Sequence, residues 1–386
     1  MRITDIRELT IPLSRYADPA LPGSGLTTSM VAVATDLRHG DRPVVGYGFA
    51  SIGRYGQGGL IRERFAPRLI GAAPDTLLDA AGQRLDPARA WAVMMAGEKP
   101  GGHGERCVAV GALDMALWDA AAKAADLPLS VLLADYLERD PEPEVRVYAG
   151  GGYPYPLNDL ERLADEMRIF ADQGFTHAKI KTGAGLETDL RRIETAAAQL
   201  GGSERLAVDA MNRYTPQQAL AAAGALAGHG LWWFEDVCDP LDFDTQSLIA
   251  ATYPGPIAAG EALFSVAEAK LLDRHGGLRR EHDILVFDPV HCYGLTGYLD
   301  IVGYLLDHGW PRRAFWPHGG HLFSLHLVAA LGLGGAEINP LAFDPFRGVF
   351  PGIPVENGIT RLPDAPGIGF ELHGPVWSVF RALGLD

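Results

Sequence analysis

Cysteine is scarce in this chain. Its three cysteines, Cys107, Cys238 and Cys292, are spread over 386 residues, which is too few for a disulfide framework. No CxxC pair is present, so the sequence does not indicate a thiolate zinc site. We therefore expect free thiols, as is typical of a protein that works in a reducing cytoplasm.

Basic side chains and long apolar runs are also lacking. The 33 Lys and Arg residues face 48 Asp and Glu residues, giving a formal net charge of −15. Nucleic acids and anionic membranes bind basic surfaces, so we expect neither as a partner. The start, MRITDIRELTIPL, does not have the pattern of a signal peptide. The longest apolar stretch, at 325–333, is too short to span a bilayer, and we expect a soluble protein.

A GxGxxG motif at the start of a helix is absent, which disfavours an open doubly wound sheet. What the chain has instead is a regular alternation after about residue 145. Short apolar segments alternate with helical segments such as 159–174 and 215–230, and these short segments are VRVYAG, AKIK, LAVDA, WWFED, IAAGE, ILVFD, AFWPH and GGAEI. The pattern predicts parallel strands joined by right-handed crossovers.

The spacing of these strands predicts that the sheet closes into a barrel. Their last residues follow one another at intervals of 26 to 30 positions, at Lys181, Asp209, Glu235, Glu261, Asp288 and His318. Eight such units make a closed α/β barrel. Strands at 1–15, 29–37 and 46–51 and a buried helix at 107–125 predict an α+β first part. We predict a capping domain at 1–140, a barrel at 141–345, and a further part of the capping domain at 346–386.

Three acids, Asp209, Glu235 and Glu261, end three neighbouring strands. Because the carboxyl ends of barrel strands meet at one mouth, their side chains should converge. Like charges at short distance need a counter-ion, and oxygen ligands without Cys or His favour a hard cation. We predict one Mg²⁺ per subunit, with Mn²⁺ as the alternative. Capping of the following helices is the competing interpretation for each acid alone, but it does not account for three in succession.

Two lysines end the strand before these acids. Alternation places Lys179 and Lys181 on the same face, toward the barrel mouth. A lysine beside another cation and a divalent metal has its ammonium form disfavoured, so we expect a lowered pKa for Lys181 and a role as general base. Lys179 is expected to contact the substrate. Alone, a KxK motif is more often a solvated strand edge.

Asp288 and His318 end adjacent strands on the far side, so a hydrogen bond between them is expected. The carboxylate would fix the imidazole tautomer and raise the pKa of His318, which could then deliver a proton. A packed histidine beside a glycine turn is the alternative. Glu337, at the end of the eighth strand, is expected to contact the substrate carboxylate. Together these residues predict proton abstraction next to a metal-bound carboxylate, with the metal stabilising an enediolate.

The chain resembles the enolase superfamily, in its mandelate racemase subgroup, over essentially its whole length. The motifs are LDMALWDAAAKAADLPL at 113–129, KIK at 179–181, the Asp/Glu/Glu strand ends, the Asp288–His318 pair and DAPGIGFE at 364–371. The resemblance implies a (β/α)7β barrel capped by an α+β domain built from both termini. It also implies assembly into a homo-oligomer.

Further stretches are similar to the D-tartrate dehydratases of that subgroup: 53–66, 97–111, 243–256 and 317–326. This similarity implies that Lys181 abstracts the α-proton and His318 protonates the departing β-hydroxyl, so that a 2-keto acid forms. It also makes Lys99, Tyr153 and Tyr155 candidate substrate contacts.

The chain departs from the family at VDAMN, where Met211 takes the position of the family's Asn and Asn212 follows. We expect a changed environment of the metal ligand Asp209 rather than a lost site. The loops at 23–30 and 48–56 carry small or apolar residues where we expect tartrate dehydratases to be more polar. Because such loops set specificity, the substrate stays open.

Two other functions stay open beside a Mg²⁺-dependent dehydratase of a tartrate-like hydroxy-diacid or acid sugar. A racemase or epimerase would use Lys181 and His318 to exchange one proton between opposite faces, with no leaving group. A non-catalytic metal-binding scaffold would tolerate the loss of both side chains. Two ionisable groups that face a buried metal are costly unless they are used, which disfavours the scaffold.

Overall fold

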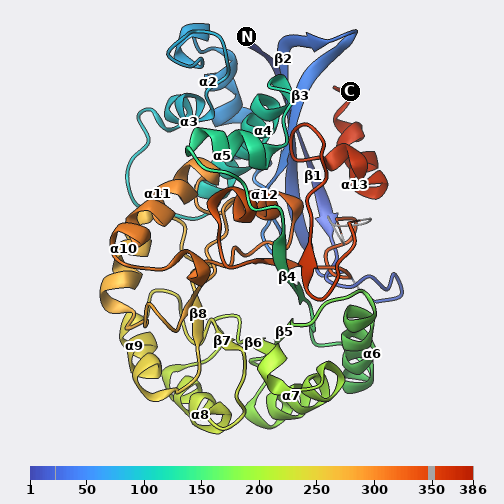
Figure 1. Ribbon diagram of the computed structural model, residues 1–386, viewed down its shortest axis with the longest axis vertical. Helices are drawn as coiled ribbons and strands as arrows, with labels where there is room; N and C mark the ends of the chain where they lie inside the picture. The colour runs from blue at the N-terminus through green and yellow to red at the C-terminus, as the bar shows by residue number, and fades with distance from the viewer. Residues whose placement is uncertain (22, 347–352, 386) are drawn as a thin grey trace.

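The computed structural model describes residues 1–21, 23–346 and 353–385. A long antiparallel sheet with helices beside it lies at one end of the molecule, and a ring of strands surrounded by helices lies at the other (Figure 1). The predicted barrel with an α+β cap is therefore confirmed. The exact domain bounds stay a prediction. Within the described ranges, no helix is long and apolar enough to cross a membrane.

The cap is a three-stranded antiparallel sheet, in the order β1-β2-β3, with helices packed against it. Its strands are β1 (Ile3–Leu13), β2 (Leu26–His39) and β3 (Arg42–Phe49). Its helical segments are α1 (Gly58–Leu60), η1 (Ile61–Phe65), α2 (Ala66–Ile70), η2 (Pro74–Thr76), α3 (Pro87–Met95), α4 (Glu105–Ala124) and α5 (Leu129–Tyr136). The helix α4 is apolar or small on most faces and is buried along most of its length, as the sequence predicts.

The barrel strands are parallel in the order β10-β4-β5-β6-β7-β8-β9. They are β4 (Val145–Gly150), β5 (Ala178–Lys181), β6 (Leu206–Asp209), β7 (Trp233–Glu235), β8 (Ile257–Ala259), β9 (Ile284–Leu285) and β10 (Ala336–Ile338). The outer helices are α6 (Asp159–Asp172), α7 (Leu186–Leu200), α8 (Pro216–Leu226), α9 (Phe243–Thr252), α10 (Val266–His275), α11 (Gly294–Asp307) and α12 (Leu322–Leu331). Short 3-10 turns, η3 (Ser203–Arg205) and η4 (Arg312–Ala314), precede β6 and follow α11.

One predicted strand, AFWPH at 314–318, is not a regular strand. Only Phe315 bridges to Leu285 of β9. The ring is continued there by single hydrogen bonds, from Trp316 N to Leu285 O (2.8 Å) and from Gly334 N to Phe315 O (3.0 Å). Pro317 has no N–H group, so it cannot extend the ladder.

The interior of the barrel is filled by side chains from alternate strand positions. Tyr148, Trp233 and Trp316 pack there with small residues as one buried cluster. Trp233 and Trp316 lie two positions before the predicted site residues Glu235 and His318, so they share the inward face with them. The apolar layer fills the barrel below the site and leaves the ionisable side chains at the carboxyl ends of the strands.

The C-terminal segment returns to the N-terminal sheet, as expected. Its elements are β11 (Ile359–Thr360), η5 (Phe370–Leu372), α13 (Gly374–Phe380) and η6 (Arg381–Leu383). Trp377 and Phe380 pack on Tyr47 of β3, with ring centres 5.1 and 5.4 Å apart. The strand β11 instead pairs antiparallel with β4, so the tail joins the cap to the barrel.

The cap also meets the barrel where α4 crosses α11. A side chain at Gly111 of α4 would place its Cβ 1.8 Å from the carbonyl oxygen of Val290, so glycine is required at this crossing. Nearby, Asp114 of α4 accepts hydrogen bonds from the backbone N–H and the hydroxyl of Thr296 (3.1 and 2.9 Å). Thr296 lies in the first turn of α11, whose own N-cap residue, Tyr293, offers no side-chain cap.

Candidate active site

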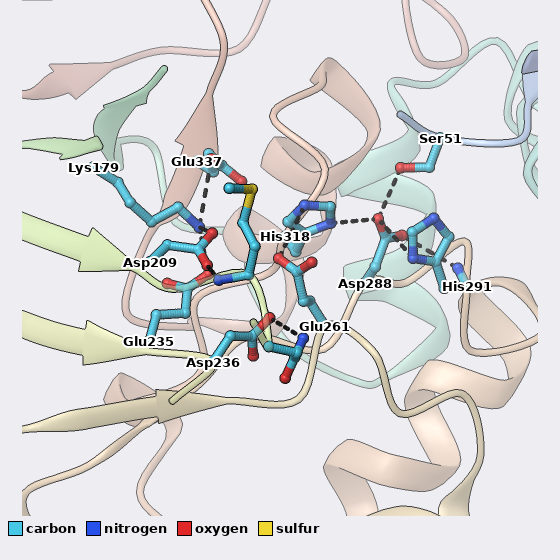
Figure 2. Close-up of polar contacts among 12 residues, drawn as sticks. Ser51, Lys179, Asp209, Glu235, Asp236, Glu261, Asp288, His291, His318 and Glu337 are labelled. Carbon is cyan, nitrogen blue, oxygen red and sulfur yellow. Dashed lines mark hydrogen bonds and ion pairs between the residues drawn. The ribbon is translucent and has the colours of Figure 1, made fainter. Parts of the chain in front are cut away.

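The three predicted carboxylates converge at the barrel mouth (Figure 2). In the parallel register Asp209 of β6 lies beside Glu235 of β7, and Glu261 follows the end of β8 by two residues. Each offers one oxygen, and these oxygens lie within 4.8 Å of one another. Asp209 and Glu235 are fully buried, whereas the Glu261 side chain is 21% exposed.

These carboxylates fit a hard divalent cation. The donor set consists of oxygens only, which is what Mg²⁺ binds in proteins. Oε2 of Glu261 is buried and accepts no hydrogen bond from the residues described. Its polar neighbour is His318 Nε2, at 3.3 Å, so it keeps acceptor capacity for a cation. Burial raises the pKa of Glu235 to about 7 in spite of Lys179, because the carboxylates of Asp209 and Glu261 also repel its charge.

A fourth carboxylate, Asp236, stands beside the three and was not among the predicted site residues. It is 5% exposed. Burial and the charges of Glu261 and Asp209 raise its pKa well above the ordinary value. The amide Nδ2 of Asn212 donates to Asp236 Oδ2 (2.8 Å). The sequence signal for Asp236 was its place directly after Glu235, which alternation alone would direct away from the barrel.

The VDAMN departure is accommodated in a tight turn after β6. Met211 and Asn212 both have left-handed backbones, with φ of 52° and 55°. The backbone N–H of Met211 donates to Asp209 Oδ1 (2.6 Å), and that of Asn212 donates to the carbonyl of Asp236 (3.0 Å). The environment of Asp209 thus includes a main-chain donor at the position where the family has an Asn side chain.

Both lysines of KIK point into the carboxylate cluster. Lys179 Nζ lies 2.5 Å from Glu235 Oε1 and 3.6 Å from Glu337 Oε1. Lys181 hydrogen-bonds to Asp209 Oδ2, and its ammonium group lies 5.4 Å from the ring centre of Tyr153. The shared inward face that the sequence predicts is therefore confirmed.

The prediction that the pKa of Lys181 is lowered is wrong when only the charges of the protein's own side chains are considered. Burial alone would lower it, but the neighbouring carboxylate of Asp209 raises the pKa of Lys181 above its ordinary value. The pKa of Lys179 is likewise raised by Glu235 and Glu337, against the effect of burial. The direct ion pair of Lys181 with Asp209 outweighs the repulsion by the second lysine, and the sequence alone does not reveal this pair.

The predicted hydrogen bond between Asp288 and His318 is present. His318 Nδ1 lies 2.9 Å from Asp288 Oδ2, and His318 Nε2 lies 3.3 Å from Glu261 Oε2. Burial alone would lower the pKa of His318, but Glu261 and the bond to Asp288 raise it to about 9. Burial would raise the pKa of Asp288, yet the imidazoles of His291 and His318 hold it far below its ordinary range.

Three further side chains surround Asp288 and were not predicted. Ser51, just beyond β3 of the cap, donates its hydroxyl proton to Asp288 Oδ2 (2.7 Å) and lies 3.3 Å from His321 Nε2. His291 is 1% exposed, and its Nδ1 lies 3.5 Å from Asp288 Oδ2. Burial lowers the pKa of His291 to about 3 and that of His321 to about 4. No local motif marks the contact of Ser51 with Asp288, because these residues are 237 positions apart.

The predicted substrate contacts are only partly brought together. Glu337 is 2% exposed and lies at the cluster beside Lys179. Tyr155 is turned away, because its hydroxyl donates to Glu166 Oε2 (3.0 Å). Lys99 is exposed, and no described contact joins its side chain to the cluster. Tyr153 packs edge-on against Phe343, with ring centres 5.7 Å apart, and also faces Lys181.

Two family models match the chain. Residues 161–376 match the model described as enolase C-terminal domain-like. Residues 27–134 match the N-terminal domain of mandelate racemase / muconate lactonizing enzyme. Together the matched ranges include the carboxylate cluster, both lysines, the Asp288–His318 pair and Ser51.

Curated relatives and solved structures agree with these matches. The arabinonate dehydratase of Saccharolobus solfataricus is 29% identical over 285 residues, 73% of this chain and 74% of the relative. The D-galactarolactone cycloisomerase of Agrobacterium fabrum is 30% identical over 307 residues, 75% of this chain and 79% of the relative. A crystal structure of L-talarate dehydratase from Polaromonas sp. JS666, complexed with Mg and L-glucarate, is 26% identical with a TM-score of 0.73, covering 98% of this chain and 96% of that one.

Proposed function

The chain belongs to the enolase superfamily, in the group of mandelate racemase and muconate lactonizing enzyme, and from this premise we propose that it is a Mg²⁺-dependent dehydratase of a hydroxy-acid. One observation carries the proposal. The carboxylate cluster is flanked by a lysine on Asp209 and by an Asp–His pair on Glu261, so a base and an acid face the same small space.

In the proposed reaction Lys181, as the neutral amine, takes the proton from the hydroxyl-bearing carbon next to the substrate carboxylate. His318, held at Nδ1 by Asp288, gives its Nε2 proton to the β-hydroxyl. The carbon–oxygen bond breaks, water leaves, and the enol product tautomerises to a 2-keto acid. Lys179 and Glu337 would orient the substrate carboxylate. Mg²⁺ bound to Asp209, Glu235 and Glu261 would supply positive charge where negative charge develops.

A 2,3-dihydroxy-diacid, of which tartrate is the smallest, is the substrate class we favour. Arg15, just after β1, stacks on Tyr153 with its guanidinium carbon 5.3 Å from the ring centre, and Lys181 contacts the same ring. No acid among the described residues pairs with Arg15, and its buried Nε has no hydrogen-bond acceptor there. A guanidinium in this state matches a second carboxylate at the far end of a substrate.

A racemase or epimerase is the second candidate. It is favoured by the placement of Lys181 and His318 on different carboxylates, Asp209 and Glu261, from which they could address opposite faces of one carbon. In that case His318 would return a proton to the α-carbon, and no bond to oxygen would break.

The test is a panel of hydroxy-diacids and sugar acids, including D-tartrate, aldarates and aldonates, assayed with Mg²⁺ for 2-keto acid with and without EDTA. EDTA-sensitive keto acid from any member is the expected result, and Arg15→Gln should then raise KM for diacids about tenfold and leave that for aldonates unchanged. Deuterium uptake at the α-carbon without keto acid would establish the epimerase. Neither signal from any member would overturn both.

A cytoplasmic location and a homo-oligomeric state belong to the same proposal. Cys107, Cys238 and Cys292 are buried free thiols, which suits a reducing compartment. The oligomeric state rests on the family resemblance.

A further inference from the structure

A row of hydrogen bonds leads from the start of α12, through the cap, to His318. The N-cap residue of α12 is His321. Its Nδ1 lies 3.4 Å from the backbone nitrogen of Ser324, and its Nε2 lies 3.3 Å from Ser51 Oγ. Ser51 Oγ lies 2.7 Å from Asp288 Oδ2, which in turn lies 2.9 Å from His318 Nδ1. Figure 2 shows the last two contacts side by side on one carboxylate.

The direction of each bond in this row follows from its first member. A backbone N–H only donates, so Nδ1 of His321 is an acceptor, and a neutral imidazole then carries its proton on Nε2. Burial lowers the pKa of His321 to about 4, so the ring is neutral near pH 7. These proton positions are inferred from the hydrogen-bond pattern.

The remaining bonds are then determined. Ser51 accepts from His321 Nε2, so its single hydroxyl proton is directed to Asp288 Oδ2. The ionised carboxylate of Asp288 only accepts, and its Oδ1 already accepts from the backbone N–H groups of Val290 (2.7 Å) and His291 (3.2 Å). His318 must therefore donate from Nδ1, which leaves Nε2 as the nitrogen that faces Glu261 and exchanges protons.

We infer that Ser51 is a positioning residue for His318: its hydroxyl, supplied by the cap just beyond β3, holds the Asp288 carboxylate so that Nε2 of His318 is directed at the reacting group. Ser51 is fully buried and has a left-handed backbone, with φ of 59°, a conformation that costs energy for a non-glycine residue. Thr28 of β2 holds it there by donating to its carbonyl (3.0 Å). The inference deepens the proposed function, on which its kinetic test rests.

The first test is Ser51→Ala. Because the hydroxyl acts on the acid and not on the base, kcat for dehydration should fall about 10- to 100-fold, as for other residues that orient a reacting group. KM should change less than about threefold, and exchange of the α-hydrogen with solvent deuterium should persist at a similar rate. A kcat within twofold of the wild type, or a parallel loss of exchange, would overturn the inference.

The matched control is Thr35→Val. Thr35 of β2 carries another buried hydroxyl of the cap, and this hydroxyl donates to the backbone carbonyl of Val44 (2.9 Å), not to Asp288. It should lower thermal stability about as much as Ser51→Ala does and leave kcat unchanged. A similar fall of kcat in both variants would mean that Ser51 acts only through the stability of the cap.

A second measurement does not depend on activity. In protein labelled with ¹⁵N-histidine, the Nδ1–H proton of His318 should give a downfield, slowly exchanging signal in the wild type and in Thr35→Val. A His318→Asn spectrum assigns it. In Ser51→Ala the signal should move upfield or be lost to exchange with water, and an unchanged signal would refute the inference. If the wild type turns over no substrate, the proposed function fails and this spectrum alone decides on Ser51.

Discussion

At the scale of single residues, the candidate base is paired with a candidate metal ligand. Lys181 hydrogen-bonds to Asp209, and that ion pair keeps its ammonium form stable. A base must be neutral, so Lys181 has to lose its proton or its partner before it can act. A cation that takes over the charge of Asp209 would weaken the pair, and binding of metal and activation of the base are then one event.

The division of work between Lys181 and His318 is testable by exchange of the α-hydrogen. Lys181→Ala should lower turnover by at least about 100-fold, the usual contribution of a general base, and abolish deuterium uptake. His318→Asn should stop keto acid formation but still allow uptake, read by NMR in D₂O. Lys270→Ala, on the outer helix α10, is the control. Activity within tenfold in Lys181→Ala would remove it as the base, and loss of uptake in His318→Asn would transfer that role to His318.

At the scale of the elements, one buried carboxylate joins two helices of different domains. Asp114 of α4 caps the first turn of α11 through Thr296. Burial raises the pKa of Asp114 to about 7. Because the folded protein binds this proton more tightly than the unfolded chain, the stabilisation is complete below about pH 4 and is lost as the pH rises through 7.

We therefore expect Asp114→Asn, whose side chain is neutral at every pH, to become more stable relative to the wild type as the pH rises. In urea unfolding, the free energy of the wild type relative to Asp114→Asn should fall by at least about 1 kcal/mol between pH 5 and pH 8, since one pKa unit corresponds to about 1.4 kcal/mol. Asp114→Ala should be less stable than both at pH 5, by about 1–2 kcal/mol, because the cap is lost. A pH-independent difference between wild type and Asp114→Asn would contradict the raised pKa.

Much of the fold could be predicted because it follows from short-range patterns in the sequence. The spacing of strand ends predicts the barrel, and the period of two predicts that Lys179 and Lys181 share a face. The prediction of a regular seventh strand was wrong, because Pro317 interrupts the hydrogen-bond ladder that the apolar residues alone suggest. Its position in the ring was still right, since Phe315 bridges to β9.

Only those site residues that the barrel geometry brings together could be predicted from the sequence. Asp209, Glu235, Glu261, Asp288 and His318 converge because they end consecutive strands. The side chain of Tyr155 is turned away from the site, because its hydroxyl donates to Glu166 of α6, and this contact depends on the packing of α6. The contact of Ser51 with Asp288 depends on how the cap docks, and the pKa of Lys181 depends on one ion pair. Neither the Ser51 contact nor the Lys181 ion pair produces a periodic pattern in the sequence.

At the scale of the whole molecule, a cation bound to Asp209, Glu235 and Glu261 would link the ends of three consecutive barrel strands, β6, β7 and β8. Mg²⁺ should raise the melting temperature of the wild type, because a ligand at 100 times its Kd stabilises the folded state by about 2.7 kcal/mol. Glu261→Gln should weaken Mg²⁺ binding by calorimetry and reduce this shift. Glu261 suits the test because, unlike Glu235, it has no lysine partner among the described residues.

Glu281→Gln is the matched control for this metal test, since Glu281 is an exposed acid paired with Arg313 on the surface. It should bind Mg²⁺ like the wild type. An unchanged affinity in Glu261→Gln would remove Glu261 from the ligand set, and an equal shift with NaCl at the same ionic strength would mean that screening of the −15 net charge, not a specific site, is responsible.

The hydroxyl of Ser51 sits on the 48–56 loop, in the part of the chain expected to choose the substrate, yet it bonds to Asp288 in the barrel. The two halves of this protein are therefore not interchangeable modules. A chimera with the cap of a relative that has another side chain at this position would change its substrate preference. It would also lose the hydroxyl that holds Asp288, and with it the support of His318. The same short segment therefore carries both a candidate determinant of substrate choice and a support for the proposed proton donor.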